Sequence, residues 1–134
     1  MVGAFLPRML RLAARYADSW NVSSTGPRTY RRLGDDFARA CEAVGRDPST
    51  VRRSWVGGCA VAATQAEAEG LTDGRFGADD EHDFGFVGTP QRVLEQMQRF
   101  ITLGVDTFIL DCGGFPSLTT LELLVSDVLP ALNA

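Results

Sequence analysis

The chain has 134 residues, of which 45% are apolar and 22% charged, a balance typical of a single globular domain rather than of a disordered tail. All thirteen basic residues are arginines scattered along the chain, and the formal net charge is −4. This argues against a nucleic-acid partner, which would need a concentrated basic face. No apolar run approaches the ~20 residues of a membrane span, and no signal-peptide core is present, so we expect a cytoplasmic location and no membrane partner.

Three cysteines, Cys41, Cys59 and Cys112, are widely spaced and form no C-x-x-C pair. An odd number without that spacing predicts neither a disulfide framework nor a zinc site. We expect reduced thiols, as in cytosolic proteins.

The first half of the chain alternates between helical and strand-like patterns. Apolar residues at helical spacing predict a helix over residues 6–16, and "DSWNV" (18–22) predicts a short strand that follows it directly. A longer apolar stripe predicts a second helix over residues 30–44, closed by Gly45 at its C-cap. The nearly all-apolar run "SWVGGCAVAA" (54–63) predicts a strand buried on both faces.

The second half continues the alternation after an interruption. Residues 65–69 predict a short helix, and "GLTDGRFGADDEHDFGF" (70–86) has no period and predicts a long loop. Thr89 is the expected N-cap of a helix that ends at Gly104. The run "VDTFILD" (105–111) predicts another strand, and a final apolar helix is expected after Ser117.

Strands that alternate with helices in this way imply an α/β fold with parallel strands. Three strands, or four if residues 1–4 form the stub of another, neither close a barrel nor complete an open sheet. We therefore expect one partial-barrel domain over residues 1–134, with a loop insertion at about 70–87, that starts in the middle of a repeating strand–helix architecture.

Four segments in register carry a resemblance to a known family. The segments "PRMLRLAARYADSWN" (7–21), "GRDPSTVRRS" (45–54), "GTPQRVLEQMQRFITLGVDTFIL" (88–110) and "FPSLTTLELLVSDVLPAL" (115–132) together resemble the C-terminal portion of bacterial luciferase-like monooxygenases. That superfamily comprises flavin- and deazaflavin-dependent (β/α)8 barrels. The resemblance implies that this chain is the C-terminal half of such a TIM barrel, since a whole barrel needs ~250 residues.

The resemblance also implies a cofactor, FMN or a deazaflavin coenzyme, whose phosphate meets a glycine-rich turn that corresponds here to "GAFLPR" (3–8). Free N–H groups at a helix N-terminus favour an anion there. Only Gly3 remains of the glycine run, and bulky residues follow it. The candidate contacts are Gly3, Arg8, Trp20 and Asn21, although Arg8 as a solvated residue and Trp20 as an aromatic plug of the barrel are the simpler interpretations. It stays open whether this chain binds any cofactor.

Catalytic residues are harder to assign. Asp111 and Cys112 follow a predicted strand, at the end where barrel active sites form, but an aspartate there often caps a loop and a nucleophilic thiol needs a nearby base. The only histidine, His82, lies in "DDEHD" (79–83), a sequence without regular metal-ligand spacing, so we predict no metal site. In the family, acid–base residues are commonly carried by early strands that this chain lacks.

Three functions remain as hypotheses. The chain is either part of a flavin- or deazaflavin-dependent oxidoreductase, with monooxygenation or hydride transfer as its reaction and catalytically incomplete by itself, or a cofactor-free structural or interaction module. A third hypothesis is a cofactorless enzyme or small-ligand binder with a pocket between protomers. Because a half-barrel exposes strand edges, we expect self-association into a homodimer or higher oligomer, or pairing with a missing N-terminal half.

Overall fold

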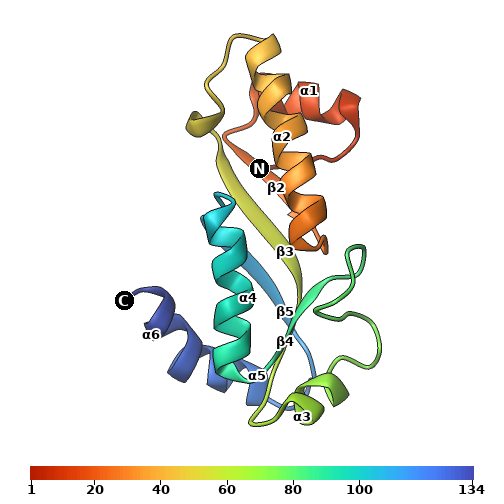
Figure 1. Cartoon of the computed structure of the whole chain (residues 1–134), viewed down its shortest axis with the longest axis vertical. Helices are drawn as coiled ribbons and strands as arrows, with labels where there is room; N and C mark the ends of the chain where they lie inside the picture. Colours follow the sequence, from red (N-terminus) through yellow and green to blue (C-terminus); the bar gives the residue numbers. More distant parts are fainter.

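A computed structural model describes all 134 residues and shows strands that alternate with helices along an elongated molecule (Figure 1). The strands are β1 (Val2–Gly3), β2 (Ser19–Ser23), β3 (Arg52–Val61), β4 (Gly85–Gly88) and β5 (Thr107–Cys112). The helices are α1 (Pro7–Tyr16), α2 (Pro27–Ala43), α3 (Gln65–Gly70), α4 (Pro90–Thr102), α5 (Thr119–Leu123) and α6 (Leu129–Leu132), with the short helices η1 (Pro48–Thr50) and η2 (Leu124–Val128).

Local signals in the sequence set the helix ends. Pro27 and Pro90 occupy the first turns of α2 and α4, where a missing N–H costs nothing. The Thr89 side chain accepts a hydrogen bond from the backbone N–H of Arg92 and so caps α4. Gly45 and Gly104 follow α2 and α4 with φ of +74° and +95°, a conformation that glycine adopts without strain. These caps confirm the predicted helices.

All five strands are parallel and form one sheet. β1 pairs with β2, β2 pairs with the first half of β3, and β5 pairs with the other edge of β3. The path β1-β2-β3-β5 therefore runs in chain order, as neighbouring strands of a (β/α)8 barrel do. β1 is therefore a strand of this sheet, which agrees with the strand stub considered for residues 1–4.

β4 lies outside this path. It pairs with residues 58–61 of β3, on the edge that β2 occupies along residues 52–56, so the two short strands lie end to end beside one long one. The prediction of a loop up to residue 87 is therefore wrong for its last residues. "GFVG" forms a strand because β3 extends far enough to offer it free backbone groups.

The core lies between the sheet and the helices. Trp20, Trp55, Tyr30, Phe37 and Phe100 are fully buried there, from strands β2 and β3 and helices α2 and α4. Their rings lie in contact, with centroids between 4.6 and 5.7 Å apart for the Trp20–Phe37, Trp20–Tyr30, Tyr30–Phe100 and Trp55–Phe100 pairs. This aromatic layer attaches α2 and α4 to the sheet.

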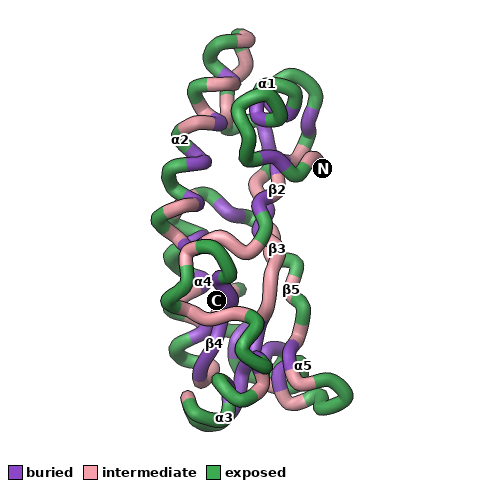
Figure 2. Tube along the Cα trace, turned by 90° about the vertical axis from the view of Figure 1, so that its right-hand side faces the viewer, coloured by how far each residue is buried: buried purple, intermediate pink, exposed green.

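The other face of the sheet is not covered by helices. Figure 2 shows α2 and α4 together on one side of β3. In β2 the buried residues Trp20 and Val22 alternate with accessible Asn21 and Ser23. In β5 half-buried residues alternate with exposed Ile109 and Asp111. A strand with one wet face shows this period of two. We call the accessible face the inner face, because in a closed barrel it would point to the axis.

The final helix differs from a regular α-helix. Its middle, η2, is a turn of π-helix between α5 and α6. Thr120, Leu124 and Val128 are its buried residues. Leu118, and not the expected Ser117, is the N-cap residue of α5, and no side chain caps the helix. The Ser117 hydroxyl accepts a hydrogen bond from the backbone N–H of Thr119. No helix of the chain combines the length and the apolar character that crossing a membrane requires.

Candidate functional site

The inner face consists of four rows of side chains, set by the register of the strands. Reading from the amino to the carboxyl end, the rows are Ser19 and Arg52; then Asn21, Ser54 and Thr107; then Ser23, Val56 and Ile109; then Gly58 and Asp111. Most of these residues are small or polar, whereas the interior of a closed barrel is usually filled by bulky branched residues. The inner face thus leaves room at its carboxyl end, where barrel active sites form.

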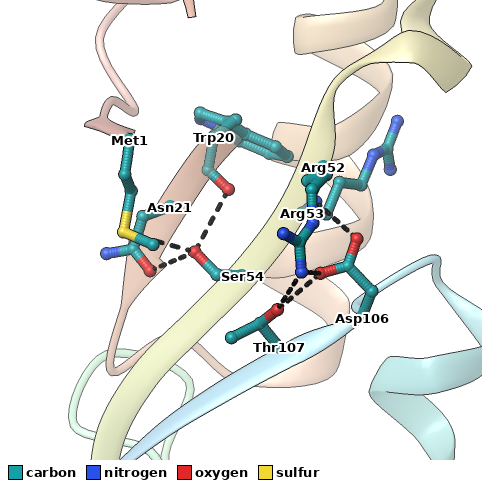
Figure 3. A network of polar contacts seen from close by, with 8 residues as sticks. All are labelled: Met1, Trp20, Asn21, Arg52, Arg53, Ser54, Asp106 and Thr107. Carbon is teal, nitrogen blue, oxygen red and sulfur yellow. Dashed lines mark hydrogen bonds and ion pairs between the residues drawn. The ribbon is translucent and has the colours of Figure 1, made fainter. Parts of the chain in front are cut away.

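A hydrogen-bonded group holds Asn21 in place on this face (Figure 3). The Ser54 hydroxyl donates to Asn21 Oδ1 over 2.8 Å, and the Met1 sulfur lies 3.7 Å from the same hydroxyl. Ser54 is fully buried. Asn21 is therefore a polar residue of the inner face whose side chain is fixed by Ser54.

Trp20 faces the other way. Its ring stacks on Phe37 at 4.6 Å with an interplanar angle of 7°, its Nε1 donates to the Ala4 carbonyl over 2.8 Å, and the Arg53 guanidinium lies 5.7 Å from its ring centroid. Because neighbouring strand residues point to opposite faces, Trp20 belongs to the layer under α2. It neither lines the inner face nor plugs the barrel.

The turn that carries Gly3 and Arg8 joins β1 to α1. Gly3 and Arg8 are both exposed, and Arg8 forms none of the ion pairs of the chain. No side chain caps α1 at Leu6. Phe5 and Leu6 remain 63% and 58% exposed, so they surround an open helix N-terminus instead of packing into the core. The end of α1 keeps free donors beside an arginine, a combination that favours an anion.

The corresponding end of α2 is already filled by a carboxylate from the loop insertion. Glu81 accepts hydrogen bonds from the backbone N–H of Thr29 over 2.9 Å and from Arg28 Nε over 3.2 Å. Burial raises the pKa of Glu81, but the bonds from Thr29 and Arg28 outweigh burial and hold that pKa below its ordinary value. Of these two helix ends, α1 alone stays open. Sequence reasoning missed this role of Glu81.

The loop insertion also covers part of the inner face at its carboxyl end. The ring of Phe76 lies so close to Gly58 and Gly85 that an added Cβ would stand 2.6 and 2.1 Å from it. Beside it, Arg75 and Asp111 line a depression of about 330 Å³ together with Ser23 and Val56. Gly58 and Gly85 leave the space that this ring occupies, and the glycines were the only sequence signal for the contact.

The side chains of Asp111 and Cys112 form no ion pair and no hydrogen bond with another side chain. Asp111 is exposed at the end of β5. Cys112 is the register partner of Cys59, and the pKa of each thiol is raised, chiefly by burial and further by Asp111 for Cys112. A protonated thiol is a poor nucleophile. His82 is exposed, and its backbone N–H bonds to Asp80 Oδ1.

Comparison with known proteins accounts for this arrangement. A family model described as luciferase-like monooxygenase matches residues 1–76. This chain belongs to that family. No curated protein matches it at a significant level.

Solved structures extend the likeness over nearly the whole chain. A coenzyme F420 dependent tetrahydromethanopterin reductase from Methanopyrus kandleri is 16% identical with a TM-score of 0.75, over 96% of this chain and 49% of the reductase. A long-chain alkane monooxygenase is 18% identical with a TM-score of 0.75, over 98% and 40%. The oxygenating constituent of 3,6-diketocamphane monooxygenase from Pseudomonas putida, solved with FMN, is 18% identical with a TM-score of 0.66, over 96% and 47%.

These likenesses establish the fold. The chain spans less than half the length of each of these three structures, which confirms the prediction of a half TIM barrel. Its four sequential strands β1, β2, β3 and β5 are four of the eight strands of such a barrel, and β4 belongs to the loop insertion.

Proposed function

We propose that this chain is half of the barrel of a flavin- or deazaflavin-dependent oxidoreductase, and that it does not catalyse by itself. The observation that carries this proposal is the composition of the inner face. At its carboxyl end the sheet itself supplies one ionisable side chain, Asp111, and the loop insertion adds Arg75 and Asp83 beside it. No histidine lines this depression, whereas acid–base catalysis needs a positioned group with a matched pKa. The remaining catalytic groups would come from the half of the barrel that completes the site.

The residues present fit the phosphate end of a flavin-type cofactor. The open N-terminus of α1 offers backbone donors, and Arg8 in its first turn adds a positive charge. Gly3 and Asn21 lie on the adjoining strands β1 and β2, where they are register partners. Trp20 is not part of this set because it is buried under α2. Bound there, the cofactor would supply hydride or oxygen chemistry, and the protein would supply its position.

Fluorescence titration tests the proposal. We expect the purified protein to quench FMN or coenzyme F420 fluorescence saturably, and Arg8→Gln to weaken the binding several-fold, as loss of one charge-assisted contact should. Arg15→Gln is the matched control, because Arg15 lies at the opposite end of α1 and should leave binding unchanged. Quenching that does not saturate, or equal effects of the two variants, would contradict the phosphate contact.

A second candidate function, a cofactor-free interaction module, is supported by the exposed edges of the sheet. This function predicts that neither cofactor binds and that the protein nevertheless associates stably. The same protein preparation distinguishes the two candidates, since the titration reports cofactor binding and light scattering reports assembly.

A further inference from the structure

The half-barrel has two open edges that face opposite ways around the ring. β1 pairs only with β2, and β5 pairs only with β3. Both strands are parallel to the rest of the sheet, so a parallel strand placed against either edge would continue the barrel. Unpaired edges of this kind attract additional strands.

An apolar stripe lies on α1, beside the β1 edge. Met9, Leu12 and Tyr16 are 39%, 45% and 74% exposed and recur at helical spacing, which places them on one side of the helix. Leu10 and Arg11, by contrast, line a groove shared with α2. The stripe therefore points away from α2, toward the position that a further helix of the barrel would occupy.

A second apolar stripe lies on the final helix, which follows the β5 edge. It consists of Leu118, Leu121, Val125 and Leu129, which are 54%, 48%, 57% and 42% exposed. The same helix turns Thr120, Leu124 and Val128 into the core. Two exposed apolar stripes of this size on one small chain indicate contact surfaces rather than scattered surface residues.

The two helices carry opposite charge, with Arg8 and Arg15 beside Leu12 of one stripe and Glu122 beside Val125 of the other. α1 contains Arg8, Arg11 and Arg15 and no acidic residue, whereas the final helix contains Glu122 and Asp127 and no basic residue. The charged residues of both helices are exposed. Complementary charge favours contact of α1 with the final helix and disfavours contact of either helix with its own counterpart.

We propose that a second copy of this chain closes the barrel. In this arrangement β1 of each copy pairs with β5 of the other, and α1 of each copy packs against the final helix of the other. Each copy has one β1–α1 edge and one β5–final-helix edge, so a two-fold axis along the barrel forms both contacts at the same time. The four barrel strands of each copy then make a barrel of eight. The proposal does not depend on cofactor binding.

The experiment measures mass by light scattering at micromolar concentration, without cofactor. The wild-type protein should have twice the 14.5 kDa mass of the chain. R8E/R15E makes α1 acidic and E122R/D127R makes the final helix basic, so each variant alone should have the single-copy mass. A 1:1 mixture should recover the two-copy mass, because both contacts of the mixed pair are again between opposite charges.

The mixture makes the test specific for this arrangement. If the two copies met through α1-to-α1 contact, E122R/D127R would stay at the two-copy mass. A wild-type protein of single-copy mass would overturn the proposal and favour a different polypeptide as the other half. A mixture that stays at single-copy mass would also overturn it. Circular dichroism checks that each variant is folded. The single variants Leu12→Ser and Val125→Ser test the apolar stripes without changing any charge, and each should lower the two-copy fraction.

Discussion

Thr120 links the final helix to the end of β3, and its removal has a cost that the structure allows us to estimate. The side chain is fully buried. Its Oγ1 accepts from the backbone N–H of Val61 over 3.2 Å and lies 3.3 Å from the Gly113 carbonyl, to which it can donate. β5 ends at Cys112, the partner of Cys59, so the hydroxyl satisfies an N–H of β3 that lies beyond the last residue paired with β5.

Thr120→Val keeps the shape of the side chain but leaves that buried N–H without an acceptor. An unsatisfied buried donor costs about 1–3 kcal/mol, so we expect the free energy of unfolding to fall by that amount in urea denaturation. Both proteins must be compared at one concentration, because association raises apparent stability. Thr119→Val is the control, since Thr119 is half-buried and bonds only with Ser117. Equal losses for the two variants would refute the linking role.

Three further predictions concern single residues. Glu81→Gln should release the loop insertion, so that trypsin cleaves after exposed Arg75 faster than in the wild type, with Asp79→Asn as the control. The fold lowers the pKa of Glu81. The stability difference between the wild type and Glu81→Gln should therefore disappear as the pH falls through that pKa. Cys112 should resist iodoacetamide at neutral pH and react as the pH rises, since burial raises the pKa of its thiol; rapid labelling at neutral pH would contradict this. Burial raises the pKa of Tyr30 to about 12 and its hydroxyl has no partner, so Tyr30→Phe should leave the melting temperature equal or higher, and a clear drop would reveal an unseen partner.

The local signals of the sequence predicted most of the fold. Thr89, Gly45 and Gly104 mark helix ends through their own backbone and side-chain preferences, so no distant contact is needed to place them. β4 could not be predicted, because four residues in a Gly- and Asp-rich segment become a strand only through the free second half of β3.

The candidate site was less predictable for the same reason. Strand alternation separates Trp20 from Asn21 but does not say which of them faces the helices, and that depends on Phe37 of the distant helix α2. The contact of Glu81 with the start of α2 joins residues more than fifty positions apart. The family resemblance predicted the half-barrel correctly because it contains this non-local information.

Hydrogen exchange at the β5 edge tests the closed two-copy barrel most directly. The Gly113 N–H bonds to the Cys59 carbonyl, and alternation along the strand then turns the N–H groups of Ile109 and Asp111 toward β3 and those of Phe108 and Leu110 toward the open edge. We predict slow exchange at Phe108 and Leu110 in the wild-type protein and fast exchange in E122R/D127R. Fast exchange at both residues in the wild type, with Ile109 and Asp111 still protected, would show an open edge and contradict the account.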